Sequence, residues 1–200
     1  MIPLIVVTSV VGYIGFDLDH AQALILDGWN PVGLVGHMFL HAGIVHLLGN
    51  MLFLWVFGNA VCAKVGNGVY PLLFLGLGLS AAFMHNVMDG STAIGASGAI
   101  NGVIGFYLIL YPLNNISCYF IFGLHPVEFS VSSVWMILFW LAFDVWGVVT
   151  GASGVAYWAH LGGFAAGAGL AAFLVSRGVI EMTGSERSLL EVVREHTAQD

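Results

Sequence analysis

The chain has 200 residues, of which 59% are hydrophobic and only 8% are charged, and its formal net charge is −7. Soluble domains carry about 25% charged residues, so this composition predicts an integral membrane protein. Only four residues are lysine or arginine, which argues against a phosphate-binding surface and therefore against a nucleic-acid partner. With about 20 residues for each span, the length allows roughly six membrane helices and no separate soluble domain.

Six apolar segments follow one another along the chain, separated by polar or glycine-rich loops, of which the first is acidic from Asp17 to Asp27. We expect an all-α membrane protein, a bundle of six transmembrane helices. Residues 1–178 would form the core and residues 179–200 a short cytoplasmic tail, with an amphipathic helix capped by Ser185. The expected spans are 2–16, 38–61, 69–86, 96–112, 132–150 and 156–176.

The few basic residues predict the orientation of the chain. Lys64 lies between the second and third spans, and Arg177, Arg187 and Arg194 follow the last one. With six spans these regions share one side, which the positive-inside rule makes cytoplasmic. We therefore expect both termini in the cytoplasm. By analogy with other small cores of this kind, we expect the membrane to be a bacterial inner membrane.

Three polar side chains, His46, Ser97 and His160, lie on separate spans that all enter from the outer side. Polar side chains in membrane segments cost free energy to remove from water, so their presence there indicates a function. The fourth span has about 17 residues, so it reaches ~25 Å at 1.5 Å per residue and begins below the outer surface. Its unpaired N–H groups would favour a developing oxyanion there. A serine nucleophile at position 97 with a histidine base at position 160 is an arrangement typical of hydrolytic enzymes.

Glycines support this geometry. Gly98 and Gly102 form a stripe on the fourth span just after Gly95, and Gly163 and Gly167 form another on the sixth span. Small residues at this spacing let membrane helices approach closely, as a serine–histidine hydrogen bond requires. The alternative is that these glycines only pack helices.

Further polar residues lie on the second span. His46 and Asn50 are four residues apart, so they share a helix face and can both donate to an oxyanion; the alternative is hydrogen bonding between helices. His37 and His41 have the same spacing and suggest either a metal site or structural hydrogen bonds. Because no cysteine, aspartate or glutamate in that span completes a set of ligands, we favour the structural role and expect no metal.

Two residues remain ambiguous. Ser153 lies in a second Gly-Ala-Ser-Gly tetrapeptide, seven residues before His160, and we interpret it as part of a flexible loop. Asp144 is the only acid inside the fifth span. It could orient a catalytic histidine, lie near a helix end or bond to a neighbouring helix, and we leave it out of the predicted catalytic set.

From about His37 to Gly169 the chain resembles the rhomboid family of intramembrane serine proteases. Each signature alone is weak, but together, in this order and on these spans, they are highly specific. The signatures are HAGIVHLLGN over 41–50, GASGA over 95–99, and AHLGG over 159–163 with a glycine at 167.

The resemblance implies a six-helix core, a Ser97–His160 dyad without an acidic third member, and no metal or organic cofactor. It also implies an oxyanion site made by the Ser97 amide, His46 and Asn50. Its substrates would be single-span membrane proteins cut near the outer boundary of the lipid bilayer.

One departure concerns the residue four after the serine, which is aromatic in many family members and stacks on the histidine. Here it is Asn101, which we expect to support the histidine by a hydrogen bond instead. The alternatives are an inactive rhomboid-like protein that binds membrane helices, and a small transporter lined by histidines. The oligomeric state stays open.

Overall fold

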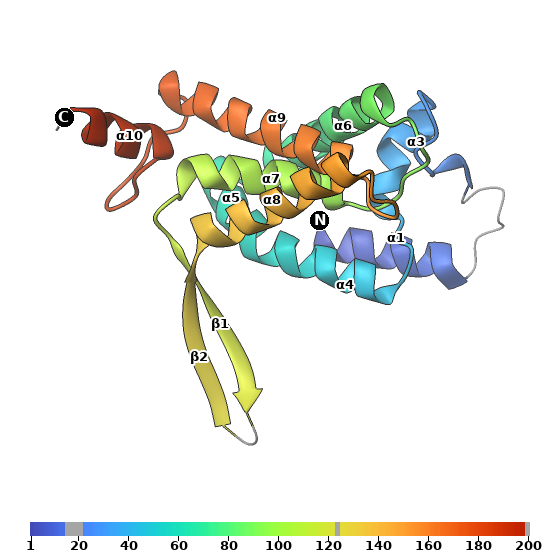
Figure 1. Ribbon diagram of the computed structural model, residues 1–200, viewed down its shortest axis with the longest axis horizontal. Helices are drawn as coiled ribbons and strands as arrows, with labels where there is room; N and C mark the ends of the chain where they lie inside the picture. Colours follow the sequence, from blue (N-terminus) through green and yellow to red (C-terminus); the bar gives the residue numbers. More distant parts are fainter. Residues whose placement is uncertain (15–21, 123–124, 199–200) are drawn as a thin grey trace.

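The computed structural model describes residues 1–14, 22–122 and 125–198, and it consists of a helical bundle with one projecting β-hairpin (Figure 1). The first part of the acidic loop, from Asp17 to residue 21, lies outside these ranges, as do the last two residues of the expected first span and the end of the tail. The elements in chain order are α1 (Ile2–Ile14), α3 (Pro31–Gly36), the 3-10 turn η1 (His37–Phe39), α4 (Ile44–Phe53), the π-helical turn η2 (Leu54–Gly58), α5 (Asn59–Val65), α6 (Tyr70–Met88), α7 (Ser97–Leu110), β1 (Asn115–Phe122), β2 (His125–Ser132), α8 (Ser133–Thr150), α9 (Tyr157–Ser176) and α10 (Leu189–Thr197).

Four helical segments of the described residues are long and apolar enough to cross a membrane, and they are Ile44–Val65, Tyr70–Met88, Ser133–Thr150 and Tyr157–Ser176. The prediction of a helical membrane protein is therefore confirmed. The count of six spans is not confirmed, because α1 and α7 are shorter, at 13 and 14 residues. The second segment begins at Ile44 instead of residue 38, since a 3-10 turn and extended residues precede it.

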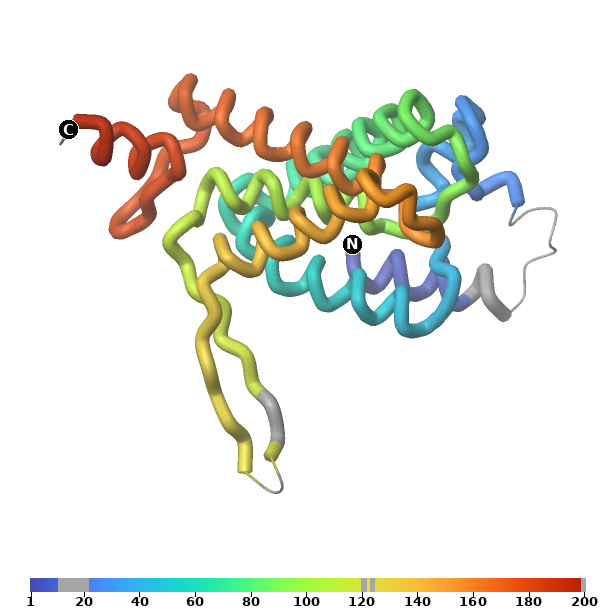
Figure 2. The backbone as a smooth tube through the Cα atoms, viewed as in Figure 1, coloured from blue at the N-terminus to red at the C-terminus, as the bar shows by residue number. Residues whose placement is uncertain are grey.

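Helix α7 lies at the centre of the bundle. Every residue from Gly98 to Leu110 except Asn101 and Leu108 is buried, and α7 packs most extensively against α9 and then against α6. Figure 2 shows α7 enclosed between α6, α8 and α9. A helix surrounded by protein need not match the thickness of the lipid core, and at 1.5 Å per residue this one measures about 21 Å.

The prediction that the protein is all helical is wrong for Asn115–Phe122 and His125–Ser132, which pair as the antiparallel strands β1 and β2. The sequence predicts a loop between the spans 96–112 and 132–150. β-branched and aromatic residues that alternate with small polar ones favour strands, and here they begin directly after the polar pair Asn114-Asn115.

The C-terminal tail returns to the bundle. The Lys64 ammonium donates to Glu186 at 2.5 Å, which joins the end of α5 to the residues after α9. Partly buried apolar residues of the tail, among them Met182 and Leu189, pack against the core. The amphipathic helix is present as α10, but its cap is Ser188 and not Ser185: the Ser188 hydroxyl accepts from the backbone N–H three residues on, which completes a capping box.

Candidate active site

Ser97 is the first residue of α7, and the loop before it needs a glycine for two reasons. Gly95 has a φ of +123°, which side-chain-bearing residues rarely adopt. A Cβ at this position would also lie only 2.7 Å from Cε1 of His46. The Gly95 N–H donates to the carbonyl of His37 at 2.8 Å, so the chain is held in place immediately before the serine.

His160 lies in the first turn of α9 and contacts two other helices through its two ring nitrogens. Nε2 is 2.9 Å from Oγ of Ser97, and Nδ1 is 2.8 Å from Oδ1 of Asp144 on α8. The Asp144 residue is 6% exposed. A carboxylate can only accept, so it requires the proton on Nδ1, and Nε2 is then left with a lone pair facing the serine hydroxyl.

Backbone contact between α7 and α9 makes this approach possible. A Cβ on Gly163 would overlap the carbonyl of Gly98, and a Cβ on Gly167 would overlap the carbonyl of Gly102. On its other side α7 packs against α6, where a Cβ on Gly98 would lie 2.7 Å from that of Ala81. The structure thus brings these four glycines together, whereas Gly95 lies in the loop and contacts the imidazole of His46.

The side chains of His46 and Asn50 reach the same place from α4. Both lie within 4 Å of the position that a Cβ of Gly95 would occupy, which is two residues before the serine. Asn50 is buried, and its Nδ2 donates to no acceptor among the described residues. The first N–H groups of α7 have no partner within the helix. These donors surround the space beside the Ser97 hydroxyl.

A cavity of about 270 Å³ opens at this position. Its walls come from α4, α7, α8 and α9 and from the loop before α9, so residues far apart in the sequence converge on it. The wall is mostly apolar, with a few polar groups, as in small-molecule and peptide sites. The lining residues include Val45, His46, Asn50, Phe53, Ser97, Ile104, Trp140, Phe143, Asp144, Val155 and His160.

Asn101 does not take the place expected for it. Its Nδ2 donates to the carbonyl of Ser97 at 3.0 Å, one turn back in the same helix, because its side chain is too short to leave the α7 surface and reach the ring. The hydrogen bond to the imidazole comes from Asp144, which is not in the predicted catalytic set. The signal for it was present, since a lone acid in an apolar span is costly unless it has a partner.

The remaining polar residues singled out in the sequence make no hydrogen bond to Ser97 or His160 among the described residues. His37 bonds through Nδ1 to the carbonyl of Gly33, and His41 bonds through Nδ1 to Oγ of Ser9. Ser153 is exposed in the loop between α8 and α9. Within residues 1–14, 22–122 and 125–198, no group of three or more histidine, cysteine, aspartate or glutamate side chains is placed to hold a metal ion.

Comparisons with known proteins agree on one family. A family model described as the Rhomboid domain matches residues 28–177. Rhomboid protease GlpG of Klebsiella pneumoniae is 30% identical over 136 residues, which cover 68% of this chain and 45% of that protein. Rhomboid protease GluP of Bacillus subtilis is 39% identical over 75 residues, 38% of this chain and 15% of that protein.

A mitochondrial relative, Rhomboid protein 1 of Saccharomyces cerevisiae, is 28% identical over 148 residues, which cover 67% of this chain and 39% of that protein. The chain therefore spans less than half the length of these three curated relatives.

Proposed function

This chain belongs to the rhomboid family, and on that basis we propose that it is an intramembrane serine endopeptidase that cleaves membrane-spanning segments of other proteins. The observation that supports this most is the 2.9 Å contact between Oγ of Ser97 and Nε2 of His160. It lies between two helices of a membrane bundle, at the wall of a cavity of about 270 Å³.

In the proposed mechanism Ser97 is the nucleophile and His160 is the base. The Ser97 Oγ attacks the scissile carbonyl carbon while its proton passes to Nε2 of His160. The oxyanion that forms accepts hydrogen bonds from the Ser97 N–H and from the side chains of His46 and Asn50. The C–N bond then breaks, and His160 gives its proton to the leaving amine. Water releases the acyl group by the same steps.

We assign Asp144 the role of a positioning residue. It does not touch the reacting atoms, but its hydrogen bond to Nδ1 of His160 fixes the ring and the tautomer. It also stabilises the imidazolium that forms when the serine is deprotonated. The proposed site is therefore a triad, although the family resemblance alone implied a dyad. Asn101 supports it only indirectly, through the carbonyl of Ser97.

The proposed substrates are single-span membrane proteins, cut near the outer boundary of the bilayer. We place residues 179–200 as a cytoplasmic tail behind a core of residues 1–178. Lys64 and Glu186 pair across these two parts, which supports putting the loop after α5 and the tail on one side. Both termini are then cytoplasmic, and we propose a bacterial inner membrane on analogy with the bacterial relatives.

The experiment is cleavage of a single-span test substrate by purified protein in lipid vesicles. Ser97→Ala should abolish cleavage, and Ser153→Ala, the matched control in the same tetrapeptide sequence, should retain it. Both variants should keep the thermal stability of the parent. If the parent cuts no substrate, yet binds membrane helices equally well with and without Ser97, the chain is a binding protein of this family and the proposal is wrong.

A further inference from the structure

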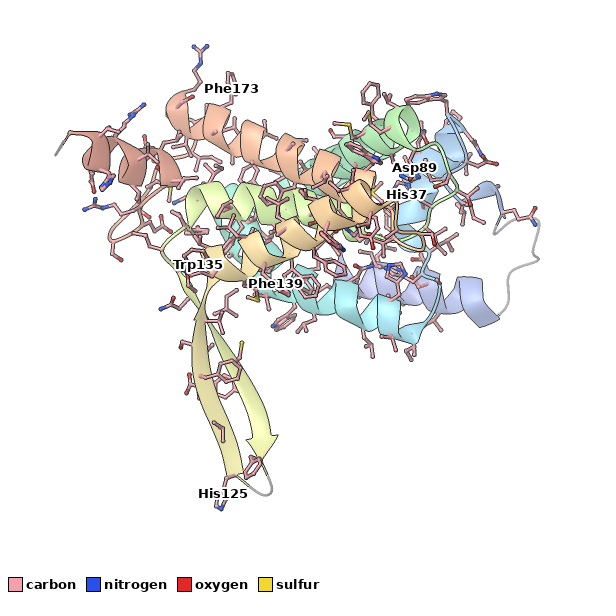
Figure 3. The ribbon with its side chains drawn as sticks, viewed as in Figure 1. His37, Asp89, His125, Trp135, Phe139 and Phe173 are labelled. Atoms are coloured by element: carbon pink, nitrogen blue, oxygen red, sulfur yellow. The ribbon has the colours of Figure 1, made fainter. Side chains whose placement is uncertain are left out.

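The β1–β2 hairpin projects away from the helical bundle. Figure 1 shows it leaving the end of the bundle where α7 stops and α8 begins, transverse to the long direction of α8. In Figure 3 Trp135 lies beside the base of the hairpin and His125 lies at its far tip. A two-stranded hairpin without other support is marginally stable at best in water, so this arm needs a surface to lie on.

The two faces of the hairpin differ sharply in polarity. Cross-strand partners share a face, and successive residues alternate between faces. The register pairs Ile116 with Val131 and Cys118 with Phe129, while Ser117 faces Ser130 and Tyr119 faces Glu128. We define the apolar face as Ile116, Cys118, Val127, Phe129 and Val131, and the polar face as Ser117, Tyr119, Glu128 and Ser130. At the tip the contrast ends, because His125 lies on the first face and Pro126 on the second.

The apolar face packs on the bundle only at its base, and its outer part is open, since Val127 and Phe129 are 40% and 49% exposed. Ile116 and Cys118 are half-buried, whereas Ser117 and Tyr119 are exposed. Ile116 also packs against the hydrophobic core. On the opposite face the hydroxyl of Tyr119 donates to Oε1 of Glu128 at 3.0 Å, a hydrogen bond that water can surround.

The apolar face lies next to the exposed apolar surface of α8. Helix α8 is a candidate membrane span, and it begins at Ser133, directly after β2. Its first turns expose Trp135 and Phe139, at 71% and 66%. Aromatic side chains at the end of a span mark the boundary between lipid and water. The base of the hairpin therefore lies at that boundary.

Charge and backbone bonding set the depth of the arm. Residues 115–132 contain one carboxylate, Glu128, and no lysine or arginine, so electrostatic attraction to anionic lipids does not hold the arm. Within the described part of the chain the sheet has two strands, so no third strand pairs with its outer edges, and open sheet edges exposed to lipid do not occur in the hydrocarbon core. The arm fits the interface, where head groups and water reach those edges.

We propose that the hairpin is an interfacial anchor, lying along the surface of the same bilayer that α8 crosses. Its apolar face rests on the lipid and its polar face points to the water. Burial of apolar area drives the binding, so neutral lipids suffice. The proposal requires no catalytic activity, and it can fail or hold independently of the proposed proteolysis.

Neighbouring residues on opposite faces give a matched test. Cys62→Ser leaves Cys118 as the single thiol on the apolar face. The control moves that thiol by one residue, with Cys62→Ser, Cys118→Ser and Ser117→Cys combined. Each protein is labelled with a nitroxide and reconstituted in phosphatidylcholine vesicles. Relaxation by oxygen, which concentrates in lipid, is compared with relaxation by a water-soluble nickel chelate.

We expect the ratio of oxygen to nickel relaxation to be several-fold higher at position 118 than at position 117. A second pair on β2, Phe129→Cys and Ser130→Cys, each made in the background lacking both native thiols, should show the same contrast. Equal, high access of the nickel chelate to both faces would overturn the proposal. So would protection of position 118 from both reagents, which would indicate a covering protein such as a second copy of the chain.

Discussion

The carboxylate of Asp144 offers the sharpest test of the proposed site, because family resemblance alone gives it no role. The change is Asp144→Ala, compared with Asp144→Asn. A hydrogen bond to a charged group contributes about 1.5–3 kcal/mol, and every 1.36 kcal/mol is tenfold in rate. Losing the bond between Asp144 and the imidazolium of His160 should therefore lower turnover by about 10- to 150-fold in Asp144→Ala.

The asparagine variant should be slower than the alanine variant, although it preserves more of the shape of the side chain. An amide can donate its N–H to Nδ1 of His160, and this favours the tautomer that carries the proton on Nε2. That tautomer cannot take the proton of Ser97. In a serine protease of another fold, the corresponding change costs about 10⁴ in turnover, and Asp144→Asn should move toward that value.

The assay is single-turnover cleavage in vesicles, together with the rate at which a fluorophosphonate probe labels Ser97. Asp27→Asn, which alters an exposed acid of the first loop, is the matched control and should react like the parent. Thermal unfolding identifies variants that fail to fold. If Asp144→Asn cleaves within about twofold of the parent, the carboxylate does not orient the base, and the site works as a dyad.

Three further outcomes follow from other contacts. Asn50→Ala should lower turnover by about 10²–10³ without lowering the melting temperature, since Nδ2 donates to no acceptor among the described residues; equal turnover would show that the amide only packs. Gly167→Ala should lower the free energy of unfolding by about 1–3 kcal/mol, because the added methyl group overpacks against α7. Gly169→Ala, with open space around its Cβ position, should not lower it. Chemical denaturation of both variants measures the difference. The Lys64 ammonium and, after it, the Thr183 N–H donate to Glu186 and hold its pKa at about 2, below the ordinary value of 4.5. Docking of the tail through Lys64 should therefore be complete above that ordinary value and should be lost as the pH falls toward about 2. Hydrogen exchange of α10 against pH, corrected for intrinsic rates, measures this, and Glu186→Gln should remove the dependence.

The membrane-spanning helices could be predicted from the sequence because each one is a long apolar segment with a clear break at its ends, whereas the short helix α3 was not predicted. The bounds of α6, α8 and α9 differ from the expected spans by only one or two residues. The hairpin escaped prediction, since its alternation is short and its aromatic residues resemble those of the neighbouring spans. The alternation favours strands locally, but a pattern this short does not predict that the two strands pair with each other.

The residues of the candidate site could also be predicted only in part. Ser97 and His160 were predicted because glycine stripes accompany both residues, and those stripes indicate which helix faces meet. The partner of a lone acid depends on how far α8 is rotated about its axis, and no stripe on α8 records that rotation. Asp144 therefore stayed ambiguous, and Asn101 received a role that its short side chain on α7 does not reach.

The backbone contact between α7 and α9 has a consequence for how the cavity opens. Two helices that touch at the carbonyls of Gly98 and Gly102 have no side chains between them to rearrange, so they move as one unit. Helix α8 is the least buried of the four candidate spans and packs much less on α7 than α6 and α9 do, so moving it would break fewer contacts with α7 than moving either of those helices. Because α8 carries Asp144, admitting a substrate by moving α8 would also release the imidazole of His160. One movement of α8 would then control both substrate entry and the hydrogen bond from Asp144 to His160. Only the complex in which α8 has returned to its closed position would have His160 oriented to act as the base.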